Sequence, residues 1–132
     1  MSVPANIVTE KDGIPVMFDG IKRGFVIRVV HSQNPKAPSK NLSVTLLYLA
    51  PGGSIAPHHH ENEEVYIILQ GQGKGFFGMS EPVPVAPGTF FHLPANAEHG
   101  LENTGDDFMK VLITTAPPFG IVPEWGSAPD EK

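Results

Sequence analysis

Cysteine is absent from the 132 residues of this chain. Disulfide bonds and thiolate metal ligands are therefore excluded, and histidine and carboxylate side chains are the only strong metal donors that remain. A chain without cysteine is compatible with a reducing compartment. We expect the protein to be cytoplasmic.

Long apolar runs and clusters of basic residues are missing as well. No segment approaches 18 consecutive apolar residues, and the first six residues, MSVPAN, do not place a hydrophobic segment after a basic one. Neither a membrane span nor a secretory signal is indicated. The net charge of −5, without any Lys/Arg cluster, argues against nucleic acid and against an anionic membrane as partners.

Glycine and proline, by contrast, are plentiful. The chain has fourteen of each, spread along its length, and they divide it into short segments about every ten residues. This pattern is typical of all-β proteins, and no long helix is visible. We expect one domain over residues 1–132, with an N-terminal arm (1–12), a barrel core (about 42–115) and a Pro-rich tail that folds back on the barrel or on a partner.

Apolar and β-branched segments predict the strands. They are expected at 14–18, 25–30, 42–50, 65–69, 74–78, 83–85, 89–93 and 108–115. The segments 42–50 and 65–69 are apolar on both faces, so the arm or a second subunit must cover their outer side, and a homodimer is predicted. The polar segment 32–40 is interpreted as an exposed connector, with a flap over the barrel mouth as the alternative.

Three histidines and three acidic residues fall within positions 58–64. Side chains alternate faces along a strand, so His58 and His60 point the same way. The residues that follow are typical of a turn, and Glu64 begins the returning strand, where its carboxylate can meet the two imidazoles. Two histidines and a glutamate form a three-ligand face that leaves metal positions open.

A fourth ligand is available in the second half of the chain. Residues 88–99, GTFFHLPANAEH, are interpreted as a strand and a turn that ends on a histidine. His99 is the natural candidate, and Asn103 follows four residues later.

The spacing of these residues resembles a known family. The first stretch matches G-x5-H-x-H-x3-E-x6-G at Gly52, His58, His60, Glu64 and Gly71. The second matches G-x5-P-x-G-x2-H-x3-N at Gly88, Pro94, His99 and Asn103. These are similar to the two signature motifs of the cupin superfamily. One position departs from the pattern, because Asn96 replaces a glycine; asparagine also accepts a positive φ, so the turn can be kept.

The resemblance implies a double-stranded β-helix, a jelly-roll barrel of six or more strands. It also implies that His58, His60, Glu64 and His99 hold one divalent transition metal per chain, with Mn, Fe, Ni and Zn all compatible with this donor set.

Several other residues are candidates for the cavity or for the surface. Tyr66 lies two residues after Glu64 and therefore on the same inward face, where its hydroxyl is a candidate catalytic group or a wall residue. His92 shares a face with Phe90, and we consider it both as a cavity acid/base residue and as a surface residue. His59 and His31 are expected on the surface. Asn103 is expected to support the turn or a metal-bound imidazole instead of binding metal.

Three functions are compatible with such a site. The leading hypothesis is a metal-dependent enzyme acting on a small substrate with a carboxylate, enol or hydroxy-carbonyl group, by a dioxygenase, decarboxylase, isomerase or lyase reaction. The alternative is a non-catalytic metal-dependent binding or sensing protein. A purely structural metal is less favoured, because a closed structural site does not need an open cavity.

Overall fold

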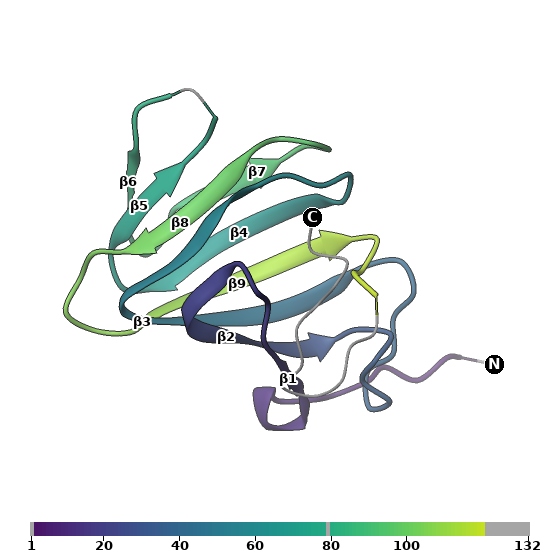
Figure 1. Ribbon diagram of the computed structural model, residues 1–132. Coiled ribbons are helices and arrows are strands. Elements are labelled where there is room, and N and C mark those ends of the chain that lie inside the picture. Colours follow the sequence, from purple (N-terminus) through teal and green to yellow (C-terminus); the bar gives the residue numbers. More distant parts are fainter. Residues whose placement is uncertain (1, 79, 121–132) are drawn as a thin grey trace.

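The computed structural model describes residues 2–78 and 80–120, and strands dominate it (Figure 1). One 3₁₀ turn, η1 (Glu10–Asp12), precedes nine strands. The strands are β1 (Ile14–Val16), β2 (Ile21–Val30), β3 (Ser43–His58), β4 (Glu63–Gln70), β5 (Gly73–Phe76), β6 (Val83–Val85), β7 (Phe90–Leu93), β8 (His99–Asn103) and β9 (Met109–Ala116). The all-β prediction is confirmed. In the described part of the chain, no helix has the length and hydropathy needed to cross a membrane.

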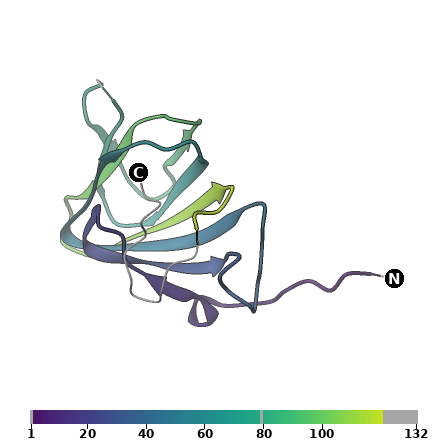
Figure 2. The same cartoon turned by 45° about the vertical axis from the view of Figure 1, so that its right-hand side comes forward.

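All nine strands belong to one curled antiparallel sheet. Its order is β6-β5-β8-β3-β9-β4-β7, with β2 bonded to β3 and β1 bonded to β2. The long strand β3 pairs with β9 through its first half and with β8 through its second half. It therefore belongs to both walls of the fold, which is the topology expected of a double-stranded β-helix. Figure 2 shows the curled sheet with the N-terminal arm extending away from it.

The change of partner along β3 occurs at a glycine pair. The strand expected at 42–50 extends further than predicted, because β3 continues through the glycine pair from Ser43 to His58. Gly52 has φ +81, and a Cβ on Gly53 would lie 2.8 Å from the carbonyl oxygen of Ala50. Because only glycine accepts these two positions without strain, β3 bends here and carries His58 toward β8.

The interior is built by strict alternation. Inward residues of β3, β4 and β9 are buried, and the residues between them are partly exposed. The same rule separates the phenylalanine pair on β7: Phe91 packs against the core, whereas Phe90 is 66% exposed. The largest apolar cluster contains Leu47, Leu49, Ile68, Leu101, Met109 and Val111, among others.

The segment 32–40 corrects the expectation of a wholly exposed connector. Asn34 and Ala37 are buried, and Asn34 Nδ2 donates a hydrogen bond to the Val29 carbonyl oxygen (2.7 Å). The segment 32–40 therefore packs against the C-terminal end of β2. His31, expected on the surface, is only 1% exposed, because this loop covers it.

The tail folds back on the barrel as far as it is described. Phe119 lies edge-on to His60, with 4.9 Å between ring centroids, and to Phe18, with 6.4 Å. Asn62 Nδ2 donates to the Pro117 carbonyl oxygen (2.6 Å). The rest of the predicted tail, including Trp125, lies outside the described residues.

Candidate metal centre

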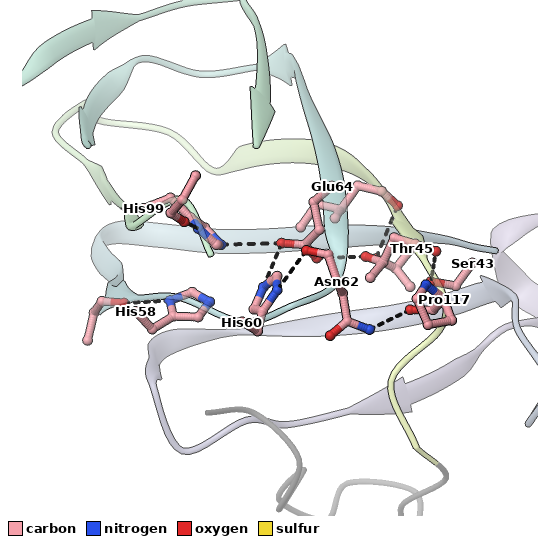
Figure 3. A network of polar contacts seen from close by, with 12 residues as sticks. Ser43, Thr45, His58, His60, Asn62, Glu64, His99 and Pro117 are labelled. Carbon is pink, nitrogen blue, oxygen red and sulfur yellow. Dashed lines mark hydrogen bonds and ion pairs between the residues drawn. The ribbon is translucent and has the colours of Figure 1, made fainter. Parts of the chain in front are cut away.

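Three histidines from the two sequence motifs lie close together (Figure 3). His58 ends β3, His60 lies in the turn before β4, and His99 begins β8. The pairing of β3 with β8 places His58 opposite His99. The three potential ligand nitrogens all lie within 4.8 Å of one another.

Each imidazole is held by a backbone carbonyl group through the ring nitrogen nearer the backbone. The Nδ1–O distances are 2.9 Å for His58 and Ala56, 3.0 Å for His60 and Asn62, and 2.9 Å for His99 and Ala97. A carbonyl oxygen only accepts, so in each pair Nδ1 carries the ring hydrogen. The three Nε2 atoms then carry lone pairs, as in histidines that bind metal through Nε2.

Glu64 completes the cluster from β4. Its Oε1 atom lies 3.0 Å from Nε2 of His60 and 3.2 Å from Nε2 of His99, while Oε2 accepts a hydrogen bond from the Thr115 hydroxyl (2.6 Å). Burial raises the pKa of Glu64. Hydrogen bonds donated by Nε2 of His60 and His99, where those rings carry a hydrogen on Nε2, and by the Thr115 hydroxyl outweigh burial and lower the pKa to about 2. Glu64 is therefore a buried carboxylate at neutral pH.

This arrangement fits a metal ion. Both ring nitrogens of His60, and both of His99, lie next to an oxygen acceptor, yet a neutral imidazole has one N–H only. A cation held by these histidines and Glu64 would satisfy the second contact of both rings. Glu64 touches two of the three histidines but does not belong to the group within 4.8 Å. Three imidazoles and an adjacent carboxylate are a donor set for divalent transition metals.

A cavity opens beside the cluster. It leaves about 40 Å³ for the centres of water molecules, which is room for a few waters. His58, Glu64 and Tyr66 form part of its wall, together with apolar side chains such as Leu47 and Ile55.

Tyr66 lies where the strand alternation predicts it. The residue is 4% exposed and shares the inward face of β4 with Glu64. Its ring stacks on Phe91, with 4.9 Å between centroids, and lies edge-on to His99 at 5.7 Å. Tyr66 is therefore next to the histidine cluster and in the cavity wall.

His92 does not reach the cavity, so the hypothesis that it lines the site is wrong. Val65 lies opposite it on β4, and both residues face outward. The His92 side chain is 56% exposed, and Nε2 lies 2.6 Å from the carboxylate of Glu63. Outward-facing positions alternate with inward ones, so Phe91 and Leu93 take the inner places on this strand.

Three other predicted positions are as expected. His59 is exposed. Asn103 is buried and supports the turn after β8: Nδ2 donates to the carbonyl oxygens of Leu49 and Asp107, and Oδ1 accepts from the Gly105 amide. Asn96 adopts the positive φ predicted for it, +66°, and its amide donates to the His60 carbonyl oxygen (2.7 Å).

Several inward-facing polar residues were not predicted from the sequence. They are Arg28, His31, Ser43, Thr45 and Thr115, all buried and all in the cavity wall. Their signal was present as alternation: Thr115 follows Val111 and Ile113 at every second position of one strand. A charged residue at position 28, inside the run FVIRVV, was a second signal.

Comparisons with known proteins agree with this fold and site. The profile of the cupin domain family matches residues 45–115. Auxin-binding protein 1 of Arabidopsis thaliana is 32% identical over 91 residues, which are 62% of this chain and 46% of that protein. The chain thus spans about half the length of the first curated relatives that it matches.

Two solved structures share the fold. The polyketide cyclase RemF from Streptomyces resistomycificus superposes with a TM-score of 0.72 at 20% identity, covering 89% of this chain and 87% of that one. A predicted oxalate decarboxylase from Thermotoga maritima gives a TM-score of 0.70 at 22% identity, covering 85% and 99%.

The chain belongs to the cupin family, because the family profile covers more than half of it. Its fold is the double-stranded β-helix of that family. Cupins commonly bind a divalent metal ion, and a cluster of three histidines suited to one is present here.

Proposed function

We propose that this cupin is a metal-dependent enzyme for a small oxygen-rich substrate, with one divalent transition metal held by His58, His60, His99 and Glu64. The observation that carries the proposal is the histidine cluster itself: three carbonyl-oriented imidazoles whose ligand nitrogens lie within 4.8 Å, beside a cavity. A bound divalent ion would act as a Lewis acid on a coordinated substrate oxygen.

The protein side chains supply the remaining functions of the site. The backbone carbonyls fix the direction of the imidazoles, and Thr115 holds the Glu64 carboxylate by its second oxygen. The Tyr66 ring lies next to His99, so its hydroxyl is our candidate for proton transfer to the substrate. The apolar wall excludes bulk water and strengthens these polar interactions.

A metal-binding experiment tests the centre. Replacing His99 by alanine removes one of the three nitrogen donors, so the metal content of the purified protein should fall from one per chain toward zero, as measured by elemental analysis. His59→Ala is the matched control, because His59 is adjacent in sequence but exposed. Unchanged metal content in His99→Ala would overturn this ligand assignment.

A binding protein without catalysis is the second candidate. The curated relatives that match 62% of this chain are named auxin-binding proteins, and a metal-assisted ligand site would need the same residues. The two functions differ in turnover: an enzyme converts a ligand that it binds, whereas a binding protein releases it unchanged. Incubation of the metal-loaded protein with candidate ligands, followed by mass spectrometry, separates them.

We further propose a cytoplasmic homodimer formed by a single domain over residues 1–132. Exposed apolar side chains on the arm and on the outer faces of β4 and β7 support self-association; they include Val3, Ile7, Leu69 and Phe90. Sedimentation should give twice the chain mass of 14.2 kDa. A monomer mass at micromolar concentration would contradict the dimer.

A further inference from the structure

A row of apolar residues crosses the outer face of the sheet. Leu46 on β3 lies opposite Leu112 on β9. Ile67 on β4 lies between Leu112 and Phe90 of β7. We call these four residues the outer row. The first three are partly exposed and Phe90 is 66% exposed, so the row forms a contiguous apolar surface of the kind that contacts another protein surface.

The outer row is widened along β4 by two more apolar residues. Val65 and Leu69 share the outward face with Ile67, because residues two apart lie on the same side of a strand. Leu69 is 44% exposed. Neighbouring strands lie about 4.8 Å apart, so the outer row is roughly 14 Å long from β3 to β7.

The N-terminal arm carries a matching set of apolar residues. Val3 is 93% exposed and Ile7 is 90% exposed, and Ala5 between them is exposed as well. In an extended chain these alternate positions point to one side, and the first and last of them lie about 14 Å apart. The apolar side of the arm therefore has the length of the outer row.

The arm begins on the outer face of its own chain and leads away from it. Oε2 of Glu10 in η1 accepts a hydrogen bond from the Tyr48 hydroxyl (2.7 Å) and lies 3.4 Å from Nζ of Lys110. The backbone amide of Thr9 donates to Oδ2 of Asp12 (2.8 Å) and closes the turn. These contacts fix the point at which the arm leaves the barrel, and both views show it directed away from the sheet (Figure 1 and Figure 2).

We propose that two copies of this chain exchange their arms, so that Val3, Ala5 and Ile7 of one chain pack on the outer row of the other. This inference rests on the homodimer proposed above and specifies its contact. A second copy fits as the partner, because each molecule offers one apolar arm and one apolar row of equal length. Two-fold symmetry uses both pairs at once and removes both apolar surfaces from water.

Association in solution tests the role of the arm. Ile7→Ser removes an apolar side chain from each arm, so the dimer dissociation constant should rise about 10-fold per arm, or roughly 100-fold in all, in sedimentation over a concentration series. Asn6→Ser is the matched control, because Asn6 is the neighbouring exposed residue on the opposite side of the arm, and it should keep the wild-type constant. A wild-type constant in Ile7→Ser would overturn the arm exchange.

Engineered cysteines test which surface the arm contacts. The natural chain has no cysteine, so introduced thiols can pair only with each other. Ala5 is in the middle of the apolar side of the arm and Ile67 is in the middle part of the outer row, so this pair does not depend on the direction in which the arm crosses the row. Under mild oxidation, Ala5→Cys/Ile67→Cys should form a disulfide between these positions of different chains, seen as a covalent dimer on a non-reducing gel and as a linked peptide pair by mass spectrometry.

A second double variant is the control for this cross-link. Val83 is 42% exposed, but it lies on β6, at the opposite end of the strand order from β4 and β7. Ala5→Cys/Val83→Cys should therefore give no linked peptide pair between its two cysteines. Equal cross-linking in the two double variants would mean that the arm has no preferred surface and would overturn the proposal.

The remaining outcomes separate this inference from the proposals on which it rests. A monomeric wild-type protein would overturn the homodimer and the arm exchange together. A dimer without the disulfide between positions 5 and 67, or with that disulfide within one chain, would overturn only the exchange. None of these results concerns the metal centre, which the metal content of His99→Ala tests separately.

Discussion

The two ends of the barrel interior are equally buried and chemically opposite. Along β3 the inward residues change from Ser43 and Thr45 to Leu47 and Leu49, and along β9 they change from Thr115 to Met109. Thr115 is 2% exposed and Met109 is 0% exposed. Burial alone therefore does not distinguish a core from a site.

The two ends differ in how burial of their side chains affects the free energy of folding. A buried apolar side chain contributes through transfer from water and close packing, and it needs no particular partner. A buried polar side chain costs free energy unless a partner satisfies it, so the polar end must be a connected network. Glu64, Thr115, His60 and His99 form such a network in this chain.

The largest effect on stability is expected at the apolar end. Leu49→Ala removes a fully buried side chain and leaves a cavity, which should lower the free energy of unfolding by about 2–5 kcal/mol. Folded Leu49→Ala should keep its metal, because Leu49 is remote from the histidines along β3. Denaturant unfolding measures the change in stability, and elemental analysis measures the metal content.

Thr45→Val is the control on the same inward face of β3. It should change stability by no more than about 1.5 kcal/mol, because the described hydrogen bond of the Thr45 hydroxyl, to the carbonyl oxygen of Ile113, is long (3.5 Å).

Replacing Thr115 should affect stability less than Leu49→Ala does, but it should affect metal affinity more. Thr115→Val removes the donor to Oε2 of Glu64 and should cost about 1.5–3 kcal/mol in metal-free protein, because the acceptor is charged. Metal affinity should fall by about 10- to 100-fold in a chelator competition titration, since a group that orients a ligand is lost. Thr114→Val, the neighbouring residue on the outer face, should leave metal affinity unchanged. Equal effects of both variants would mean that the Thr115 hydroxyl has no special role.

The smallest effect on stability is expected at Tyr66. Tyr66→Phe removes only a hydroxyl group and should cost no more than about 0.5–1.5 kcal/mol, with metal content intact. If the hydroxyl transfers a proton, turnover of an identified substrate should fall by roughly 10²–10⁴. Tyr48→Phe is the control, because the chain's other tyrosine lies on the outer face, where its hydroxyl donates to Glu10 (2.7 Å). Full activity in Tyr66→Phe would make Tyr66 a wall residue only.

Some features could be predicted from the sequence because they depend on local spacing. The distribution of glycine and proline predicted an all-β fold, and two-residue alternation placed Tyr66 on the same face of its strand as Glu64. The His58–Glu64 stretch predicted a cluster at the end of a strand. All of these follow from the pleat of a strand and from turn chemistry.

Other features were not accessible in this way. Alternation gives two opposite faces but does not say which of them is inside, so His92 remained open until the pairing of β7 with β4 decided it. His31 was wrongly expected on the surface, because its burial depends on a loop that folds under β2. Arg28 was overlooked because its burial depends on hydrogen-bond partners 5 and 92 residues away, Gln33 and Gly120.

The sequence by itself determined most of the strands and the candidate ligand types of this cupin. Strand periodicity, the absence of cysteine and the spacing of His58, His60, Glu64 and His99 are properties of the chain that need no partner. Tertiary structure alone decided which polar residues share one interior, because strands distant in sequence become neighbours only when they pair in the sheet. The curled sheet then encloses their inward side chains (Figure 2). The buried polar residues from Glu64 to Arg28 lie on β4, β9, β3 and β2, and they meet only through inter-strand hydrogen bonding.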